Sequence, residues 1–87
     1  MYNYENLYSG GDQMSTGYDL IFGKNLRSVR MSCKMTQNEL SEKLNAKGYE
    51  LSVHDINEIE MGKRYVYPHE LKAFHLALNV SYDVLLP

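Results

Sequence analysis

With 87 residues, 44% of them hydrophobic, the chain is long enough for one domain, and we expect no separate catalytic or small-molecule effector domain. It has no apolar run that could span a membrane and no stretch near its start that resembles a signal peptide, and its single cysteine excludes an internal disulfide, so we predict a cytoplasmic protein. The net charge of −2 excludes a strongly basic protein, but residues 21–87 carry all nine basic residues against eight acidic ones, and these could gather on one positive face.

Residues 1–19 differ from the rest of the chain. They are rich in Tyr, Asn, Gly and Ser and show no helical spacing of apolar residues. We predict that residues 1–19 form a flexible N-terminal extension and that residues 20–87 form the folded domain.

Helical spacing begins at Leu20. Phe22, Leu26 and Val29 repeat at i, i+4 and i+7, which predicts an amphipathic helix over residues 20–34. Three basic side chains occupy its outer face: Lys24, Arg27 and Lys34. They are either contacts to an anionic partner or an ordinary solvated face.

A capping box marks the second helix. The hydroxyl of Thr36 can accept from the amide of Glu39, and the glutamate can reach back, so the sequence predicts a helix over residues 36–45. Leu40 and Leu44 supply its buried face, and Gly48 is the predicted turn residue after it.

A third helix is predicted over residues 52–61. Ser52 is its capping residue, with Asp55 at the third position beyond it. Ile56 and Ile59 point inward, and Gly62 occupies the place of a C-terminal capping glycine.

Two further helices complete the chain. Pro68 suits the first turn of a helix over residues 68–78, and Asn79 is the predicted stop. Its apolar stripe consists of Leu71, Phe74 and Leu78. Ser81 is the predicted cap of a short helix over residues 81–86, with Val84 and Leu85 inside. The sequence therefore predicts an all-α fold of five helices.

Three segments, in this order and spacing, resemble the lambda-repressor-like helix-turn-helix family of phage Cro and repressor, or Xre, type. They are Thr36-Gln37-x-Glu39-Leu40, Ile56-x-x-Ile59-Glu60-x-Gly62-Lys63-Arg64 and Leu78-Asn79-Val80-Ser81. The resemblance covers Phe22 to Leu86, and the extra residues around Gly48 resemble a longer-turn variant. It implies a five-helix domain that reads the major groove of double-stranded DNA with the helix at about residues 52–61.

The resemblance also implies individual roles. The positions that face base edges are Val53, His54, Asp55 and Glu58. Contacts to the DNA backbone are expected from Gln37, Ser52, Asn57, Lys63 and Arg64. Arg30 and Glu60 match a family pair that ties the first helix to the third. Relatives of this size often bind as dimers, so a homodimer is an expected state.

The charge of the third helix departs from the family pattern. Asp55 and Glu58 stand where relatives usually place Arg, Lys, Gln, Ser or Thr, and carboxylates repel phosphates and accept only from cytosine N4. Two hypotheses follow. The first is a sequence-specific DNA-binding regulator of transcription. The second is a protein-interaction module, antitoxin-like or anti-repressor-like, that keeps the fold with weak or no DNA binding.

Other kinds of chemistry find little support in the sequence. Gln37 has a simpler interpretation than a phosphate contact, as an ordinary surface residue of a capped helix. His54 has no other His or Cys at ligand spacing, so no metal site is predicted. No nucleophile with a nearby base and no Gly-rich phosphate loop can be assembled, so we expect neither an enzyme nor a cofactor.

Overall fold

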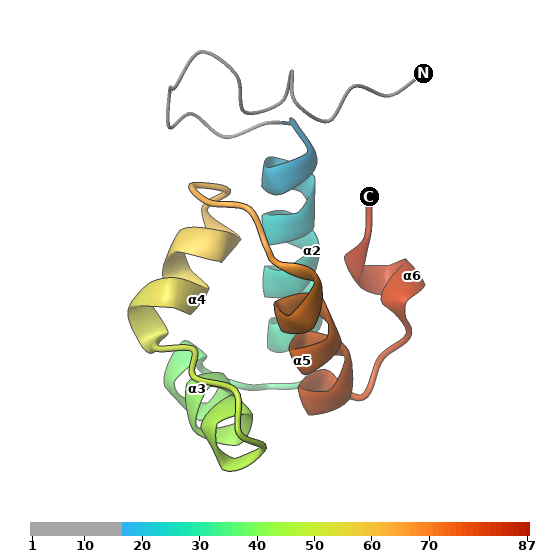
Figure 1. Cartoon of the computed structure of the whole chain (residues 1–87). Helices are drawn as coiled ribbons and strands as arrows, with labels where there is room; N and C mark the ends of the chain where they lie inside the picture. Colours follow the sequence, from blue (N-terminus) through green and yellow to red (C-terminus); the bar gives the residue numbers. More distant parts are fainter. Residues whose placement is uncertain (1–16) are drawn as a thin grey trace.

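A computed structural model of the chain describes residues 17–87, and every regular element in that range is helical. The elements are α2 (Gly17–Ser32), α3 (Gln37–Ala46), α4 (Val53–Glu60), α5 (Pro68–Leu78) and α6 (Tyr82–Leu85). The long helix α2 runs through the centre, with α4 and α6 packed against it on opposite sides, and α3 packs on α4 and α5 (Figure 1). The predicted all-α fold of five helices is confirmed.

One apolar core joins all five helices. Its fully or nearly buried members are Phe22, Leu26, Leu40, Leu44, Leu51, Ile56, Ile59, Ala73, Phe74, Ala77, Leu78 and Leu85. Phe22 of α2 and Phe74 of α5 meet across it with ring centroids 6.3 Å apart. One predicted core residue is wrong: Val84 is 49% exposed. Since α6 is a single turn, it directs only Leu85 fully into the core.

The first helix starts earlier than predicted. It begins at Gly17 rather than at residue 20, so residues 17–19 belong to α2 and not to an extension. Asp19 lies in its first turn and is buried, and a carboxylate at that place interacts favourably with the positive end of the helix dipole. The flexibility predicted for residues 1–16 lies outside the described residues.

Three helices end in the same hydrogen-bonded motif. After each helix a residue with positive φ returns its N–H to the last turn, as does the residue after it, which is the Schellman motif. The positive-φ residues are Lys34 (57°), Gly48 (94°) and Gly62 (71°). Both glycines occupy the positions predicted for them. At the end of α2, Lys34 occupies the positive-φ position, which favours glycine.

Replacing Lys34 by glycine should therefore stabilise the protein. A side chain in the left-handed region destabilises the folded protein by roughly 1–2 kcal/mol. Glycine removes this strain, but it is also more flexible in the unfolded chain, which offsets part of the gain. We expect a net gain of about 1 kcal/mol, seen as a rise in Tm of roughly 4–8 °C in thermal unfolding followed by circular dichroism. Lys34→Ala removes the same charge but keeps Cβ. A Tm for Lys34→Gly no higher than that of Lys34→Ala would contradict this explanation.

The end of α5 is joined to α6 by a histidine. Asn79 ends α5 with a positive φ of 56°, as its predicted role as the stop requires. Nδ1 of His75 is in hydrogen-bond contact with the carbonyl of Val80, and its ring stacks on Tyr82 of α6 with centroids 4.1 Å apart. Ser81 is the residue before α6, but its side chain makes no capping hydrogen bond.

Helices α2 and α4 lie very close together at Gly23. A Cβ at this position would lie 2.7 Å from the carbonyl oxygen of Glu60 and would also clash with the carbonyl oxygen of Ile59. Those two carbonyls belong to the last turn of α4. The absence of a side chain at Gly23 thus sets how closely α4 can lie against the central helix.

Candidate nucleic-acid interface

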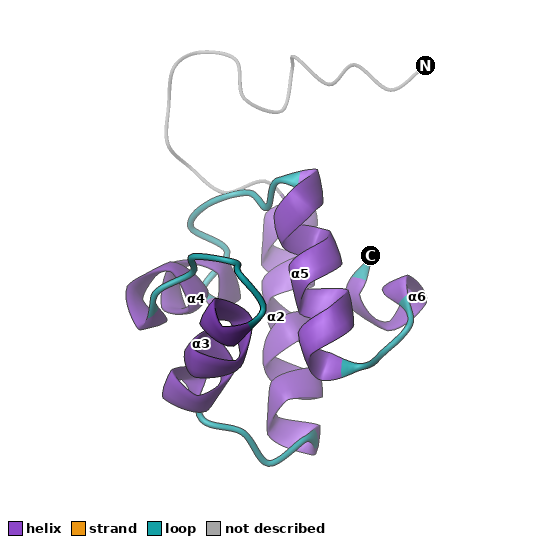
Figure 2. Ribbon diagram, turned by 60° about the horizontal axis from the view of Figure 1, so that its bottom comes forward, coloured by secondary structure: helices purple, strands orange, loops and turns teal. Residues whose placement is uncertain are grey.

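Helices α3 and α4 form a helix-turn-helix, and a side chain of α3 anchors the turn between them. The turn spans residues 47–52 and connects the C-terminal end of α3 to the N-terminal end of α4 (Figure 2). The buried hydroxyl of Ser41 donates to the carbonyl of Leu51 at 2.6 Å, and Leu51 itself is buried in the core. Tyr49 packs against the same core. The long turn is therefore fixed close to the point where α4 begins.

The first turn of α4 is closed by a reciprocal cap. The hydroxyl of Ser52 accepts from the amide of Asp55 at 3.0 Å, and the carboxylate of Asp55 accepts from the amide of Ser52 at 2.9 Å. The bond from the Ser52 backbone lowers the pKa of Asp55 against the opposing effect of burial, helped by the Ser52 hydroxyl and the charge of Arg64. The carboxylate of Asp55 thus has a structural role in the cap of α4, in addition to the base contact predicted for it.

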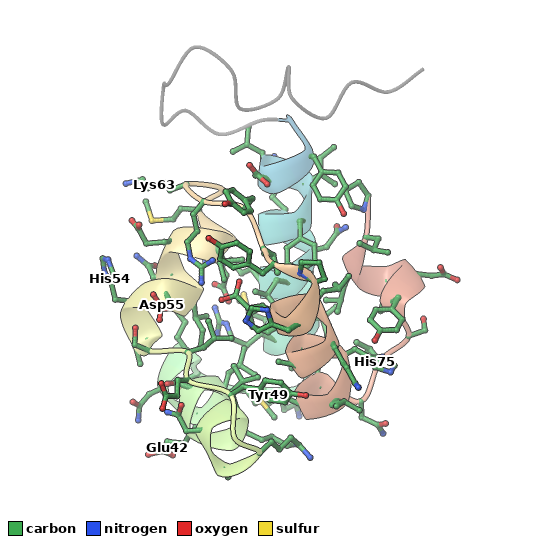
Figure 3. The ribbon with its side chains drawn as sticks, in the orientation of Figure 1. Glu42, Tyr49, His54, Asp55, Lys63 and His75 are labelled. Atoms are coloured by element: carbon green, nitrogen blue, oxygen red, sulfur yellow. The ribbon has the colours of Figure 1, made fainter. Side chains whose placement is uncertain are left out.

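The remaining predicted base-contact residues lie on the outward side of α4. Val53 is 38% exposed, and the side chains of His54 and Glu58 are 79% and 34% exposed. His54 points away from the bundle in Figure 3. Nε2 of His54 lies 4.0 Å from Oε1 of Glu58, one turn along the helix. The structure therefore gathers these three side chains on one solvent-facing surface, with Ile56 and Ile59 on the opposite, buried side.

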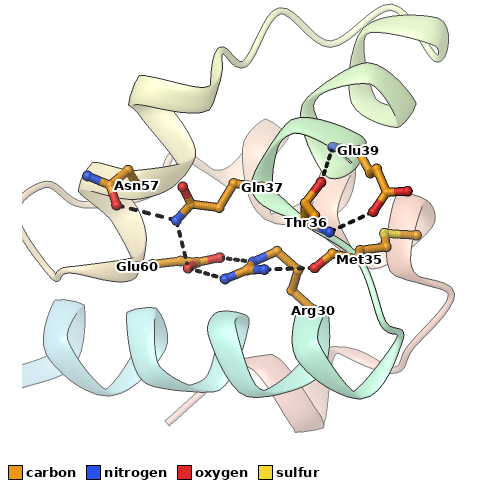
Figure 4. Close-up of polar contacts among 7 residues, drawn as sticks. All are labelled: Arg30, Met35, Thr36, Gln37, Glu39, Asn57 and Glu60. Atoms are coloured by element: carbon orange, nitrogen blue, oxygen red, sulfur yellow. Dashed lines mark hydrogen bonds and ion pairs between the residues drawn. The ribbon is translucent and has the colours of Figure 1, made fainter.

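A buried ion pair ties α4 to α2 (Figure 4). The guanidinium of Arg30 donates to both carboxylate oxygens of Glu60, at 2.6 and 3.0 Å, and to the carbonyl of Met35 at 2.7 Å. The two side chains are only 11% and 3% exposed. The bond to Glu60 raises the pKa of Arg30 above its ordinary value, although burial opposes it. Arg30 and Glu60 are thus paired in the way the resemblance implies.

Gln37 joins this network from the start of α3. Its Nε2 donates to Oε1 of Glu60 at 3.0 Å and to Oδ1 of Asn57 at 3.3 Å. An amide nitrogen carries two hydrogens, and both are used here. The side-chain nitrogen expected to hold a phosphate must break one of these bonds to do so, whereas the backbone N–H of Gln37, at the first helical position, has no acceptor within the helix. Sequence reasoning did not connect Gln37 and Asn57, which are far apart along the chain.

The two basic residues after α4 have different surroundings. Lys63 is exposed and points away from the bundle on the α4 side (Figure 3). Arg64 is half-buried, and its guanidinium donates to both oxygens of Glu70, at 3.0 and 3.1 Å, and to the carbonyl of Tyr65. Burial lowers the pKa of Arg64, but the bonds to Glu70 outweigh it and the net shift is upward. Arg64 thus joins the loop to α5, and only Lys63 of the two extends freely towards solvent beside α4.

Within residues 17–87, no three His, Cys, Asp or Glu side chains come together as metal ligands. No helix in this range combines the length and the apolar character that crossing a bilayer requires.

Similarity to known proteins lies in the fold. No protein-family model matches the chain and no curated protein sequence matches it. Among solved structures, the clp gene regulator ClgR from C. glutamicum is 31% identical, with a TM-score of 0.67 over 77% of this chain and 82% of that one. The DNA-binding domain of BldD is 24% identical, with a TM-score of 0.71 over 85% of this chain and 100% of that one. The restriction-modification controller protein C.AhdI from Aeromonas hydrophila is 22% identical, with a TM-score of 0.69 over 78% of this chain and 96% of that one.

Proposed function

The chain belongs to the lambda-repressor-like helix-turn-helix family, and we propose that it is a sequence-specific DNA-binding regulator of transcription that reads the major groove with α4. The observation that carries this proposal is the outward face of α4. There Val53 and His54 lie exposed and Glu58 half-exposed, on a helix whose other face is buried in the core. A gene regulator, a controller protein and a DNA-binding domain share its fold, which supports the same role. This role needs no catalytic step and implies a cytoplasmic location.

The contacts divide into two kinds. Side chains at the start of α4 would meet base edges and specify sequence, while Lys63 and the backbone N–H at the start of α3 would hold phosphates and set the orientation. Arg64 acts in this proposal through its bonds to Glu70, by fixing the loop that presents Lys63.

The charge of the interface sets the expected strength of binding. Residues 36–64 contain six acidic and four basic residues. Two of the carboxylates, Asp55 and Glu60, are bonded inside the protein. Glu58 is half-exposed on the outward face and repels phosphates. We therefore expect weaker dependence on salt than for a basic relative, because fewer phosphates are neutralised.

Replacing Lys63 by alanine should weaken binding to all sequences about equally. The contact is to a phosphate and not to a base, so the log–log slope of affinity against salt should fall by about one unit. Fluorescence anisotropy with DNA from upstream of the protein's own gene, at several NaCl concentrations, measures both quantities. Lys72→Ala is the matched control, since Lys72 is an exposed lysine on α5.

Replacing Glu58 by glutamine should tighten binding to mixed-sequence DNA. The change removes a repelled charge and leaves an amide of the same shape, so affinity should rise by roughly 2- to 5-fold at low salt. The amide can also pair with adenine, so the preferred sequence should shift at one position. Glu42→Gln, at an exposed position of α3, controls for the general effect of a lost charge. An equal gain in both variants would contradict a place for Glu58 at the DNA.

The alternative function gives a different result in the same assay. A protein-interaction module that has lost DNA affinity should show negligible binding of the wild-type protein even at low salt, and no response to Lys63→Ala. That pattern across several upstream sequences would reject the DNA-binding proposal and leave the fold untouched.

We propose a homodimer as the DNA-bound form. One α4 of eight residues reaches a single half-site, and two-fold operators match two-fold proteins. Sedimentation of the protein with a two-fold symmetric operator should give two chains per duplex. A complex of one chain per duplex at saturation would contradict it.

A further inference from the structure

Three aromatic side chains lock together on the surface between α4 and α5. The hydroxyl of Tyr65 donates to that of Tyr67 at 3.2 Å, and their rings meet edge to face with centroids 5.0 Å apart. On its other side, the ring of Tyr67 stacks on His69 with centroids 5.8 Å apart and planes 12° from parallel. Tyr67 is 45% exposed, yet its ring is held by a neighbour on each side. Its hydroxyl therefore has a defined position at the surface.

This cluster lies near the start of α4. His69 and Glu70, in the first turn of α5, line the same surface hollow as Leu51, which comes just before the cap of α4. Arg64 bonds to Glu70, and its charge helps to lower the pKa of Asp55 in the first turn of α4. Arg64 thus lies within electrostatic reach of the first turn of α4 while it bonds to the first turn of α5, and Tyr67 is the residue directly before α5.

The bond between the two hydroxyls needs only one of their two hydrogens. With Tyr65 as the donor, the oxygen of Tyr67 accepts, and the hydroxyl of Tyr67 can donate to a ligand at the surface. Accepting a hydrogen bond polarises a hydroxyl and strengthens its own donation. Two charged side chains beside Tyr67, Arg64 and Glu70, form an ion pair with each other. A phosphate at this place would thus be held by a neutral donor and not by a net positive field.

We propose that the hydroxyl of Tyr67, oriented by Tyr65, donates a hydrogen bond to a DNA phosphate beside the groove that α4 enters. The inference rests on the proposed DNA-binding function and adds a neutral backbone contact to the ionic contact of Lys63. Neutral donors to phosphate position a protein on the duplex, but they displace no condensed counterions. Such a contact adds affinity without added positive charge, which suits a reading helix that carries carboxylates.

The test is the salt dependence of Tyr67→Phe. This variant loses only the hydroxyl and keeps the ring that packs between Tyr65 and His69, so its melting temperature should equal that of the wild type. Titrating mixed-sequence double-stranded DNA at several NaCl concentrations should show binding about 2- to 10-fold weaker at every concentration, with an unchanged log–log slope. Tyr65→Phe, which removes the orienting donor, should give a smaller loss with the same slope.

Tyr82→Phe is the matched control. Tyr82 is an exposed tyrosine of α6 whose ring is also stacked, on His75, and it should bind as the wild type does. Wild-type affinity for Tyr67→Phe, or a loss equal to that of Tyr82→Phe, would overturn the tyrosine contact while DNA binding stands. A change in slope of about one unit would overturn its neutral character. Failure of the wild-type protein to bind any duplex would reject the proposed function and this contact together.

Discussion

Replacing Gly23 by alanine should destabilise the protein by about 3 kcal/mol, a large effect for the addition of one methyl group. The new Cβ would overlap the carbonyl oxygens of Ile59 and Glu60. These are backbone atoms in the last turn of α4, so they cannot move aside without moving the helix. Urea unfolding followed by circular dichroism measures the loss.

Gly17→Ala provides the matched control for this prediction. A Cβ at Gly17 would meet no atom within 4 Å, and alanine is the better helix former, so this variant should be as stable as the wild type or slightly more stable. Equal unfolding midpoints for Gly23→Ala and Gly17→Ala would show that α2 and α4 can separate at little cost.

Arg30→Ala should cost about 3–5 kcal/mol, because it leaves the carboxylate of Glu60 buried without its cation. The same change also removes the bond to the carbonyl of Met35. Arg27→Ala, on the exposed face of the same helix, should cost far less. Similar melting temperatures for the two variants would show that the pair contributes little to stability.

A double variant separates the ion pair from the packing around it. Arg30→Met combined with Glu60→Leu replaces both charges by apolar groups, which is often neutral or stabilising for a buried pair. We expect the double variant to be more stable than Arg30→Ala.

Local signals in the sequence predicted most of the fold. Four signals act over short stretches of sequence: the capping residues Thr36 and Ser52, the helix-starting Pro68 and the turn glycine Gly48. The helices begin or end within two residues of these signals. The start of α2 was missed because its signal is tertiary. Asp19 is buried by the fold and belongs to no apolar stripe that the sequence displays.

The sequence could predict which residues form the outward face of α4, but it could not predict their hydrogen-bond partners. The outward positions of His54 and Glu58 follow from helical spacing once Ile56 and Ile59 are known to face inward. The partners of a polar side chain depend on which helices meet. The pairing of Arg64 with Glu70 requires the placement of the loop against α5, which no spacing rule supplies.

The long turn between α3 and α4 is held near both of its ends. The Schellman motif at Gly48 closes the end of α3, and the bond from Ser41 fastens Leu51 where α4 begins. Between these two anchors Glu50 is exposed, two residues before the Ser52 cap of α4. A fluorophore attached at Glu50 would leave both anchors intact. It would lie beside the start of the reading helix, in a position to report on DNA binding while leaving that helix where it is.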